Sequence, residues 1–245
     1  MINNNNKIGI IIQARMGSTR LPAKIMMDIK NKSILEYQLK RLDEIECPII
    51  IATTLEPQDD VIEKFALDHD LSFFRGDQDN VLKRYYDCAA YFKLDTIIRI
   101  TSDCPLIDGQ VIKQGMIQYQ KANNQNLYLS NTLERTFPRG ADFEIFSFLQ
   151  LEDAIKNATE DSDLEHVTPY IWKNKSGSVE IVQLMQMNDF SAFRLTLDTH
   201  DDFKLIRILI EDYNASNLSI QEICEVMSLH PELNEINKHI EQKKA

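Results

Sequence analysis

Several patterns that would define a class of protein are missing from this sequence. Its 245 residues include four cysteines but no Cys-x-x-Cys pair, which argues against a zinc site or a disulfide framework and favours a reducing cytosol. No apolar run is longer than a strand, so no membrane span is predicted. Met1–Lys7 lacks the apolar core of a secretory signal. We therefore expect a soluble, cytoplasmic protein without a membrane partner.

An excess of positive charge is also missing. The formal net charge is −11 at pH 7, which argues against a nucleic-acid partner because such proteins carry a basic face. A small phosphorylated ligand remains compatible with this charge, since a few cations can gather locally in an acidic protein. Four of the histidines show no metal-ligand spacing: His69, His200, His230 and His239.

Strand-like and helical patterns alternate through the first half of the chain. The predicted strands are Ile8–Gln13, Pro48–Ala52, Leu71–Phe74 and Thr96–Thr101. Predicted helices begin at the capping box Ser33–Glu36, at Pro57 with the first-turn acids Asp59 and Asp60, near Asp79 and at Asp108. This order predicts an α/β fold with a doubly wound, mostly parallel sheet. The loops after the four strands should then converge on one edge of the sheet.

The second half is less regular. The predicted strands are Leu127–Asn131, Phe143–Phe146, Val179–Leu184 and Phe193–Leu197. The predicted helices are Ser147–Lys156, Leu164–Trp172, Asp201–Asp212 and two short helices within Ser219–Lys244, split at Pro231. No repeat, low-complexity tract or long linker interrupts the chain. We expect a single domain over residues 1–245, with a small β-containing excursion at about 128–184 and C-terminal helices at about 219–244.

The loop after the first predicted strand concentrates positive charge around Gly17. A glycine lets the backbone approach an anion and expose its N–H groups. Arg15, Arg20 and Lys24 supply charge, and Ser18 adds a hydroxyl. The spacing matches neither the dinucleotide fingerprint nor the P-loop. A crossover loop with solvated arginines is the alternative, but the carboxyl end of a buried strand favours binding of a polyphosphate.

Two aspartates follow predicted strands at the same edge of the sheet. Asp103 comes after Thr96–Thr101, and Asp198 comes after Phe193–Leu197. Hard oxygen donors opposite a cationic loop suit Mg²⁺, which keeps its other positions for water and phosphate oxygens. Such a pair would suit nucleotidyl transfer. The alternative for each aspartate is a helix N-cap.

Two further features have competing interpretations. Asp77 and Asp79 form an Asp-x-Asp pair, which binds metal in many glycosyltransferases, although a cap of the following helix is favoured here. His166 lies on a predicted helix, where a structural or surface role competes with contact to a substrate.

Seven motifs together resemble the SpsF-like cytidylyltransferase family of spore coat polysaccharide proteins. The acylneuraminate and 3-deoxy-manno-octulosonate cytidylyltransferases are its relatives. In this chain the motifs are Ile12–Lys24, Arg75–Tyr85, Arg99–Asp108, Ser130–Thr132, Phe137–Gly140, Glu165–Tyr170 and Arg194–Thr199. Three positions depart from the family pattern without removing a charge: Ala23, Ser102 and His200.

The resemblance implies a nucleotide-diphospho-sugar transferase (Rossmann-like) fold and assigns residues to ligands. CTP would be held by Ala14, Arg15, Gly17, Ser18, Arg20 and Lys24, with Thr53, Asp79 and Arg84 on the base and ribose side. The metal ligands would be Asp103 and Asp198. The acceptor would face Asn131, Arg139, Asp142, Glu144, His166, Tyr170 and Arg194.

The resemblance also implies an activity. An acceptor oxygen would attack the α-phosphorus of CTP and release pyrophosphate, with Mg²⁺ as cofactor. The catalytic groups would be Arg15, Arg20, Lys24 and Asp103, of which the cations offset charge on the leaving group. The acceptor would be a sugar acid or a phosphorylated compound for surface polysaccharide or glycoconjugate synthesis. Relatives are often dimers, so a homodimer is a further expectation. The alternatives are a glycosyltransferase with a nucleotide-sugar donor and a protein that binds nucleotides without turnover.

Overall fold

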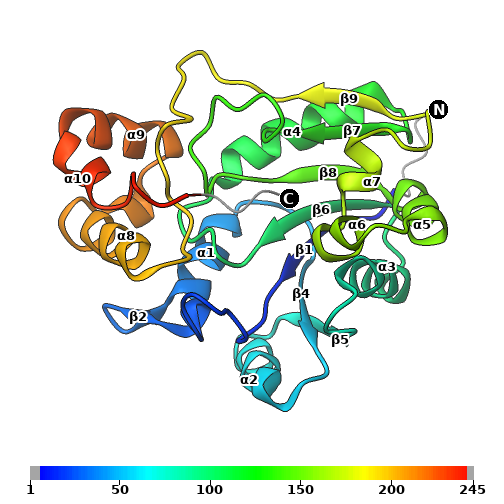
Figure 1. Cartoon of the computed structure of the whole chain (residues 1–245), viewed down its shortest axis with the longest axis horizontal. Coiled ribbons are helices and arrows are strands. Elements are labelled where there is room, and N and C mark those ends of the chain that lie inside the picture. The colour runs from blue at the N-terminus through cyan, green and yellow to red at the C-terminus, as the bar shows by residue number, and fades with distance from the viewer. Residues whose placement is uncertain (1–5, 242–245) are drawn as a thin grey trace.

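A seven-stranded sheet forms the centre of the protein in the computed structural model, which describes residues 6–241 (Figure 1). The strand order is β5-β4-β1-β6-β8-β7-β9. The strands are β1 (Ile8–Gln13), β4 (Ile49–Thr54), β5 (Ser72–Gly76), β6 (Thr96–Thr101), β7 (Leu127–Ser130), β8 (Glu144–Ser147) and β9 (Glu180–Gln183). β8 runs antiparallel to β6 and β7, and the remaining pairs are parallel. The predicted α/β class with a mostly parallel sheet is confirmed.

Helices cover both faces of this sheet, and strand β1 shows why. Ile10, Ile11 and Ile12 are all fully buried, so successive side chains of β1 enter opposite layers of core. Ile10 and Ile12 pack in a cluster with residues of α1 (Ile34–Leu42), α2 (Asp60–Asp68) and α4 (Gly109–Ala122). Ile11 packs in a cluster with residues of α3 (Val81–Phe92), α5 (Phe148–Asn157) and α7 (Pro169–Trp172).

A third apolar cluster joins the C-terminal helices to α1 and to loop residues that include Leu21, Leu106 and Phe137. These helices lie together at one side of the molecule (Figure 1). The remaining helices of the described chain are α6 (Asp161–His166), α8 (His200–Asp212), α9 (Ile220–Leu229), α10 (Pro231–Glu235) and the short 3-10 helices η1 (Lys24–Met26), η2 (Pro57–Asp59) and η3 (Ala215–Asn217). A two-stranded ribbon pairs β2 (Asp28–Ile29) with β3 (Lys32–Ser33).

Side-chain caps begin α1 and α4 where the sequence places them, whereas α3 is capped by Asn80 instead of the Asp77–Asp79 pair. Ser33 and Glu36 form the predicted capping box of α1, and Asp108 caps α4. The predicted split at Pro231 separates α9 from α10. The leader Met1–Lys7 and the end of the predicted Ser219–Lys244 segment lie partly outside the described residues. Within residues 6–241, no helix has both the length and the apolar character needed to cross a bilayer.

Two predictions for the second half are wrong. Residues 193–197 form an extended segment with one isolated bridge, between Arg139 and Arg194, instead of a strand. Leu195 and Leu197 are fully buried against the C-terminal helical cluster, so their alternating pattern reflects helix contacts. The predicted helix Leu164–Trp172 is also broken into α6 and α7. Pro169 cannot continue a helix because it has no backbone N–H, and it begins α7 instead.

Candidate active site

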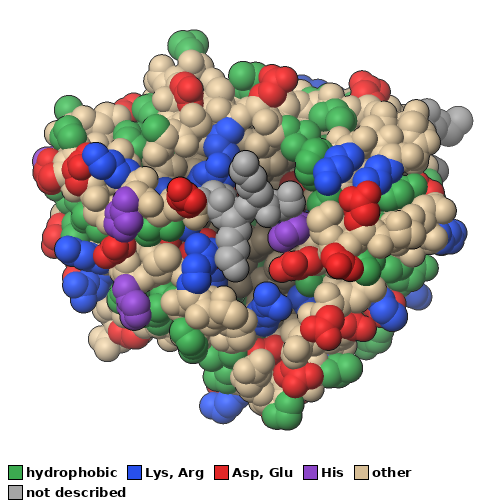
Figure 2. Space-filling model, in the orientation of Figure 1, with side chains coloured by type: hydrophobic (Ala, Val, Ile, Leu, Met, Phe, Trp, Pro, Cys, Tyr) green, Lys and Arg blue, Asp and Glu red, His purple; other side chains and the backbone are tan. Residues whose placement is uncertain are grey.

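The loops after β1, β4 and β6 meet at one edge of the sheet, as predicted from the parallel order. Backbone hydrogen bonds link the first residue of two of these loops to the neighbouring strand, from Ala14 N to Ala52 O of β4 at 3.0 Å and from Ser102 N to Gln13 O of β1 at 3.2 Å. The face of the molecule seen in Figure 2 is hollowed near its centre, and Lys and Arg side chains gather around the hollow.

Lys24 connects the two predicted metal-binding aspartates. Its Nζ lies 3.0 Å from Asp103 Oδ2 and 2.7 Å from Asp198 Oδ1. The two carboxylates, 95 positions apart in the chain, therefore face a single cation. Burial acts to lower the pKa of Lys24, but the charges of Asp103 and Asp198 outweigh it and raise this pKa above its ordinary value.

Asp198 is surrounded by cations. Besides Lys24, Arg20 Nη2 lies 3.0 Å and Arg194 Nη2 lies 2.9 Å from Asp198 Oδ2. Burial acts to raise the pKa of Asp198, but these positive charges and hydrogen bonds lower it below the usual range. Asp198 is therefore ionised at neutral pH and concentrates three basic side chains at this edge.

The helix-cap alternative does not describe either aspartate. Asp108 is the N-cap of α4, and Thr199 is the N-cap of α8. Arg194 is held in place by the fully buried Asp202, whose Oδ1 accepts a hydrogen bond from Arg194 Nε at 2.8 Å. The approach of the 193–199 segment to the sheet edge thus depends on α8.

The donor set at Asp103 and Asp198 suits Mg²⁺. Their oxygens are hard ligands, and both carboxylates already contact one positive charge on Lys24. Among residues 6–241 there is no group of three or more His, Cys, Asp and Glu side chains that would hold a metal without help. One or two carboxylates completed by phosphate oxygens and water is the usual arrangement for Mg²⁺ bound together with a nucleotide.

On the predicted base and ribose side, the three residues differ in exposure. Thr53 and Arg84 are buried, and in the described chain Thr53 Oγ1 and Arg84 Nε have no hydrogen-bond partner. Asp79 is exposed. Asp77 Oδ1 accepts hydrogen bonds from the backbone N–H groups of Asp79 and Asn80, at 3.0 and 2.9 Å, so Asp77 orders the turn before α3.

Four predicted acceptor residues use their polar atoms to hold the protein together. Asn131, fully buried, donates to Ala141 O and accepts from Phe143 N. Asp142 pairs with Arg135. Arg194 pairs with Asp198 and Asp202, as described above. Glu144 accepts hydrogen bonds from Tyr128 and Thr168 through Oε1 and pairs with Arg99 through Oε2.

Arg139 and His166 differ from these four. Within residues 6–241 neither the Arg139 guanidinium nor the His166 ring makes a hydrogen bond or ion pair with another side chain. Burial lowers the pKa of His166 and outweighs the charge of Glu165, which acts to raise it. The neutral form of the ring is therefore favoured. These two side chains remain available to a ligand.

A tight turn follows His166. Val167 has φ 72° and ψ −52°, and Thr168 N donates to His166 O at 2.8 Å, which closes a γ-turn. This conformation is costly for a β-branched residue. Thr168 ties the turn to Glu144, so His166 has a fixed position beside the Arg99–Glu144 pair.

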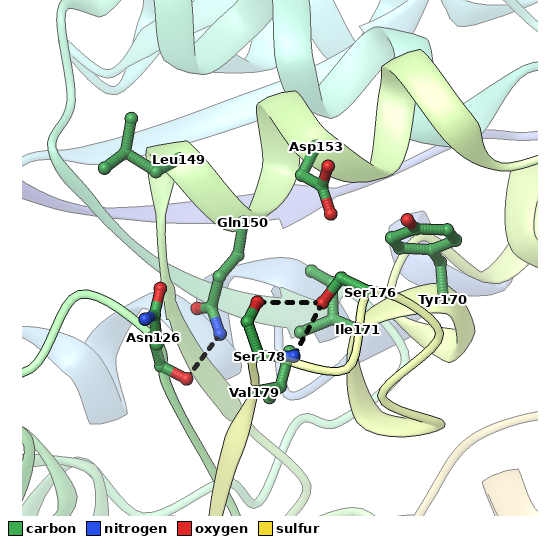
Figure 3. A pocket seen from close by; sticks show the side chains of 9 residues that line it. All are labelled: Asn126, Leu149, Gln150, Asp153, Tyr170, Ile171, Ser176, Ser178 and Val179. Atoms are coloured by element: carbon green, nitrogen blue, oxygen red, sulfur yellow. Dashed lines mark hydrogen bonds between the residues drawn. The ribbon is translucent and has the colours of Figure 1, made fainter.

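Tyr170 lies at the opposite edge of the sheet. It lines a pocket of about 260 Å³ together with Asn126, Asp153 and Ser178 (Figure 3). Asn126 directly precedes β7, which runs in the same direction as β1 and β6, so this pocket is at the amino ends of the strands. The structure does not bring Tyr170 together with Lys24 and Asp103.

Ala23, one of the three departures from the family pattern, has a backbone conformation that is unusual for alanine. Its φ is 56°, in the left-handed region that glycine adopts without strain, directly before Lys24 in η1. The backbone that turns Lys24 toward the two aspartates is thus slightly strained in this chain.

Comparisons with known proteins identify the family of this chain. A family model described as Cytidylyltransferase matches residues 9–239. An uncharacterized protein of Methanocaldococcus jannaschii is 35% identical over 240 residues, covering 97% of both chains. The spore coat polysaccharide biosynthesis protein SpsF of Bacillus subtilis is 29% identical over 237 residues, covering 93% of this chain and 96% of SpsF.

A solved structure is similar over nearly the whole chain. It is a cytidylyltransferase from Leptospira borgpetersenii, with a TM-score of 0.89 and 33% identity, covering 96% of this chain and 99% of the other. The family match and the whole-length similarity agree with the observed fold. The chain therefore belongs to the cytidylyltransferase family and is a CTP-dependent nucleotidyltransferase.

Proposed function

We propose that this enzyme transfers CMP from CTP to a sugar acid or a phosphorylated acceptor, that the reaction depends on Mg²⁺, and that pyrophosphate leaves. The observation that carries the proposal is the contact of Lys24 with both Asp103 and Asp198, beside Arg20. This cluster offers cations for a triphosphate and carboxylates for a metal at the same point of the sheet edge.

The chain's own residues would act mainly by position and charge. Lys24 and Arg20 would face the phosphates next to Asp198, where they offset the negative charge that grows on the departing pyrophosphate. Arg15 is exposed at the end of β1 and adds a third cation. Asp103 and Asp198 would hold Mg²⁺, which supplies charge neutralisation on the phosphate oxygens.

The acceptor would be recognised from the second half of the chain. Arg139 offers a planar fork that suits a carboxylate or a phosphate, and its side chain has no protein partner in the described residues. His166 offers a neutral hydrogen-bonding ring. SpsF carries spore coat polysaccharide biosynthesis in its name. An anionic sugar for a surface polysaccharide fits the Arg139 and His166 side chains and also the process that SpsF is named for.

The test is release of pyrophosphate from CTP with a panel of sugar acids and sugar phosphates, with Mg²⁺ and with EDTA. The proposal predicts Mg²⁺-dependent pyrophosphate release with at least one anionic acceptor, and a CMP-linked product by ³¹P NMR. Turnover of a CDP-, UDP- or GDP-sugar with release of a nucleoside diphosphate would instead identify a glycosyltransferase. Full activity in EDTA would contradict the metal assignment.

A further inference from the structure

Asp59 is a buried carboxylate that the proposed chemistry does not use. It ends η2 and stands at the N-cap position of α2, yet its side chain makes no cap hydrogen bond to that helix. Its side chain is fully buried. An aspartate at this position normally caps its own helix, so its partners elsewhere need an explanation.

Both carboxylate oxygens of Asp59 contact the loops at the sheet edge. Oδ1 accepts a hydrogen bond from Met16 N at 2.7 Å, across 43 positions of the chain. Oδ2 accepts from Thr54 Oγ1, and Thr54 Oγ1 in turn accepts from Glu56 N at 3.1 Å. Asp59 therefore ties the loop after β1 to the loop after β4.

The hydrogen bond to Met16 holds the middle of the cationic loop. Met16 O accepts from Ser18 N at 2.9 Å and from Ala23 N at 3.1 Å, so this one residue organises the turn between Arg15 and Lys24. The next residue, Gly17, also lies against η2, since a Cβ there would come within 3.2 Å of Gln58 Nε2. Asp59 and its neighbour thus support the loop from behind.

A carboxylate suits this task better than a neutral acceptor. Hydrogen bonds from backbone N–H groups to an ionised oxygen are about twice as strong as those between neutral groups. Thr54 donates to the other oxygen and fixes the plane of the carboxylate. Because Asp59 holds Met16 N, it also fixes the position of the neighbouring residue Arg15.

We propose that Asp59 is a positioning residue: through Met16 N it holds the loop so that Arg15 and Gly17 face the β- and γ-phosphates of the nucleotide. This inference rests on the proposed function. It places Asp59 behind the loop, out of contact with substrate, and it predicts an effect on triphosphate binding that exceeds any effect on CMP.

The experiment measures the Kd of CTP and of CMP by calorimetry with Mg²⁺ for the full chain and four variants. Asp59→Ala removes both acceptors and should weaken CTP about tenfold or more, which corresponds to about 1.4 kcal/mol, while CMP changes less than about threefold. Asp59→Asn keeps one oxygen for Met16 N but loses the charge and the second acceptor, so its CTP affinity should fall between those of Asp59→Ala and the unmodified enzyme. Asp68→Ala is the matched control, because the Asp68 side chain is 58% exposed on the same helix and pairs only with Lys64 among the ion pairs of the described residues.

Thr54→Val gives an independent test if Asp59→Ala fails to fold, because it removes only the hydroxyl that orients the carboxylate. It should weaken CTP more than CMP. Equal losses of CTP and CMP in either variant, or unchanged CTP affinity, would overturn the inference. If the unmodified enzyme bound CMP and CTP equally well, the phosphate loop itself would be wrong, which is a failure of the proposed function and not of Asp59 alone.

Discussion

The candidate site lies at the end of the sheet where the loops after β1, β4 and β6 meet, and its two halves use their polar residues differently. On the side built from β1 and β6, Lys24 and Asp103 contact each other across the edge and remain partly exposed to solvent. On the side built from β7 and β8, Asn131 and Glu144 are buried and their polar atoms are occupied by the protein. The first side keeps charged groups near the surface, as the proposed function requires, and the polar groups of the second side mainly hold its own irregular loops.

This difference shows why residue type is a weak guide to acceptor contacts. A buried Glu or Asn in an irregular region must satisfy nearby donors and acceptors, because unpaired polar groups are costly in a core. Only Arg139 and His166, among the predicted acceptor residues near this edge, lack a side-chain partner within residues 6–241. The variants below test whether the two sides are separable.

The largest effect is expected from Asp103→Asn. The substitution keeps the shape but removes the charge that Lys24 contacts and that Mg²⁺ would need, so turnover should fall at least about 100-fold. The fold should survive, which circular dichroism and the melting temperature would check. Asp68→Asn is the control, because Asp68 is an exposed partner of Lys64. Near-normal turnover of Asp103→Asn would show that the metal is held elsewhere.

Lys24→Met should destabilise the protein when Mg²⁺ is absent. Asp103 and Asp198 would face each other without their shared cation, at a cost of about 2 kcal/mol, below the value for fully buried pairs because both are partly exposed. Mg²⁺ should recover part of the loss. Urea unfolding with and without Mg²⁺ measures this. The exposed pair variant Lys64→Met should change stability by no more than about 0.5 kcal/mol. If Mg²⁺ stabilised Lys24→Met and Lys64→Met equally, Lys24 and Mg²⁺ would not neutralise the same two aspartates.

On the other side, Asn131→Ala and Arg139→Ala should separate stability from acceptor binding. Asn131→Ala leaves Ala141 O and Phe143 N unpaired in the core and should cost about 2 kcal/mol. Arg139→Ala should change stability by less than about 0.5 kcal/mol yet raise the acceptor KM. Chemical denaturation and steady-state kinetics provide the two readouts. A stability loss in Arg139→Ala as large as that of Asn131→Ala would contradict the distinction.

The smallest effect concerns pH. The pKa of His166 is lowered in the folded protein, so the unfolded chain binds a proton more readily. The folded protein is therefore favoured by a neutral His166 above about pH 6.5, and this part of its stability is lost as pH falls through the pKa of His166 in the folded state. His166→Gln removes it. Comparing urea midpoints at pH 7.5 and 5.5 should show a slightly smaller loss in His166→Gln than in the unmodified protein, and an equal or larger loss would contradict the direction.

The regular first half was predictable because its signals are local. The apolar run of β1, the Ser33 capping box and the Asp108 cap each depend on a few neighbouring residues. Asp103 could be placed at the sheet edge because it directly follows the apolar strand Thr96–Thr101, and Pro105 prevents that strand from continuing.

The missed features depend on contacts between distant segments. The extended 193–197 segment is shaped by α8, and Asp59 owes its role to Met16, 43 positions earlier. The turn at Val167 is held by Thr168 and Glu144. In the sequence Asp59 has the pattern of an ordinary first-turn acid, because no neighbouring residue indicates that its side chain bonds to a distant loop instead of to its own helix.

The division between the two sides can be tested most directly by one comparison of thermal stabilisation by CTP with Mg²⁺. At a hundred times its Kd a ligand adds about 2.7 kcal/mol, which gives a clear rise in melting temperature. We expect this rise in the unmodified enzyme and in Arg139→Ala, and its loss in Asp103→Asn or when EDTA replaces Mg²⁺. A full CTP-induced rise in Asp103→Asn, or its loss in Arg139→Ala, would contradict the assignment of the nucleotide to the side formed by β1 and β6.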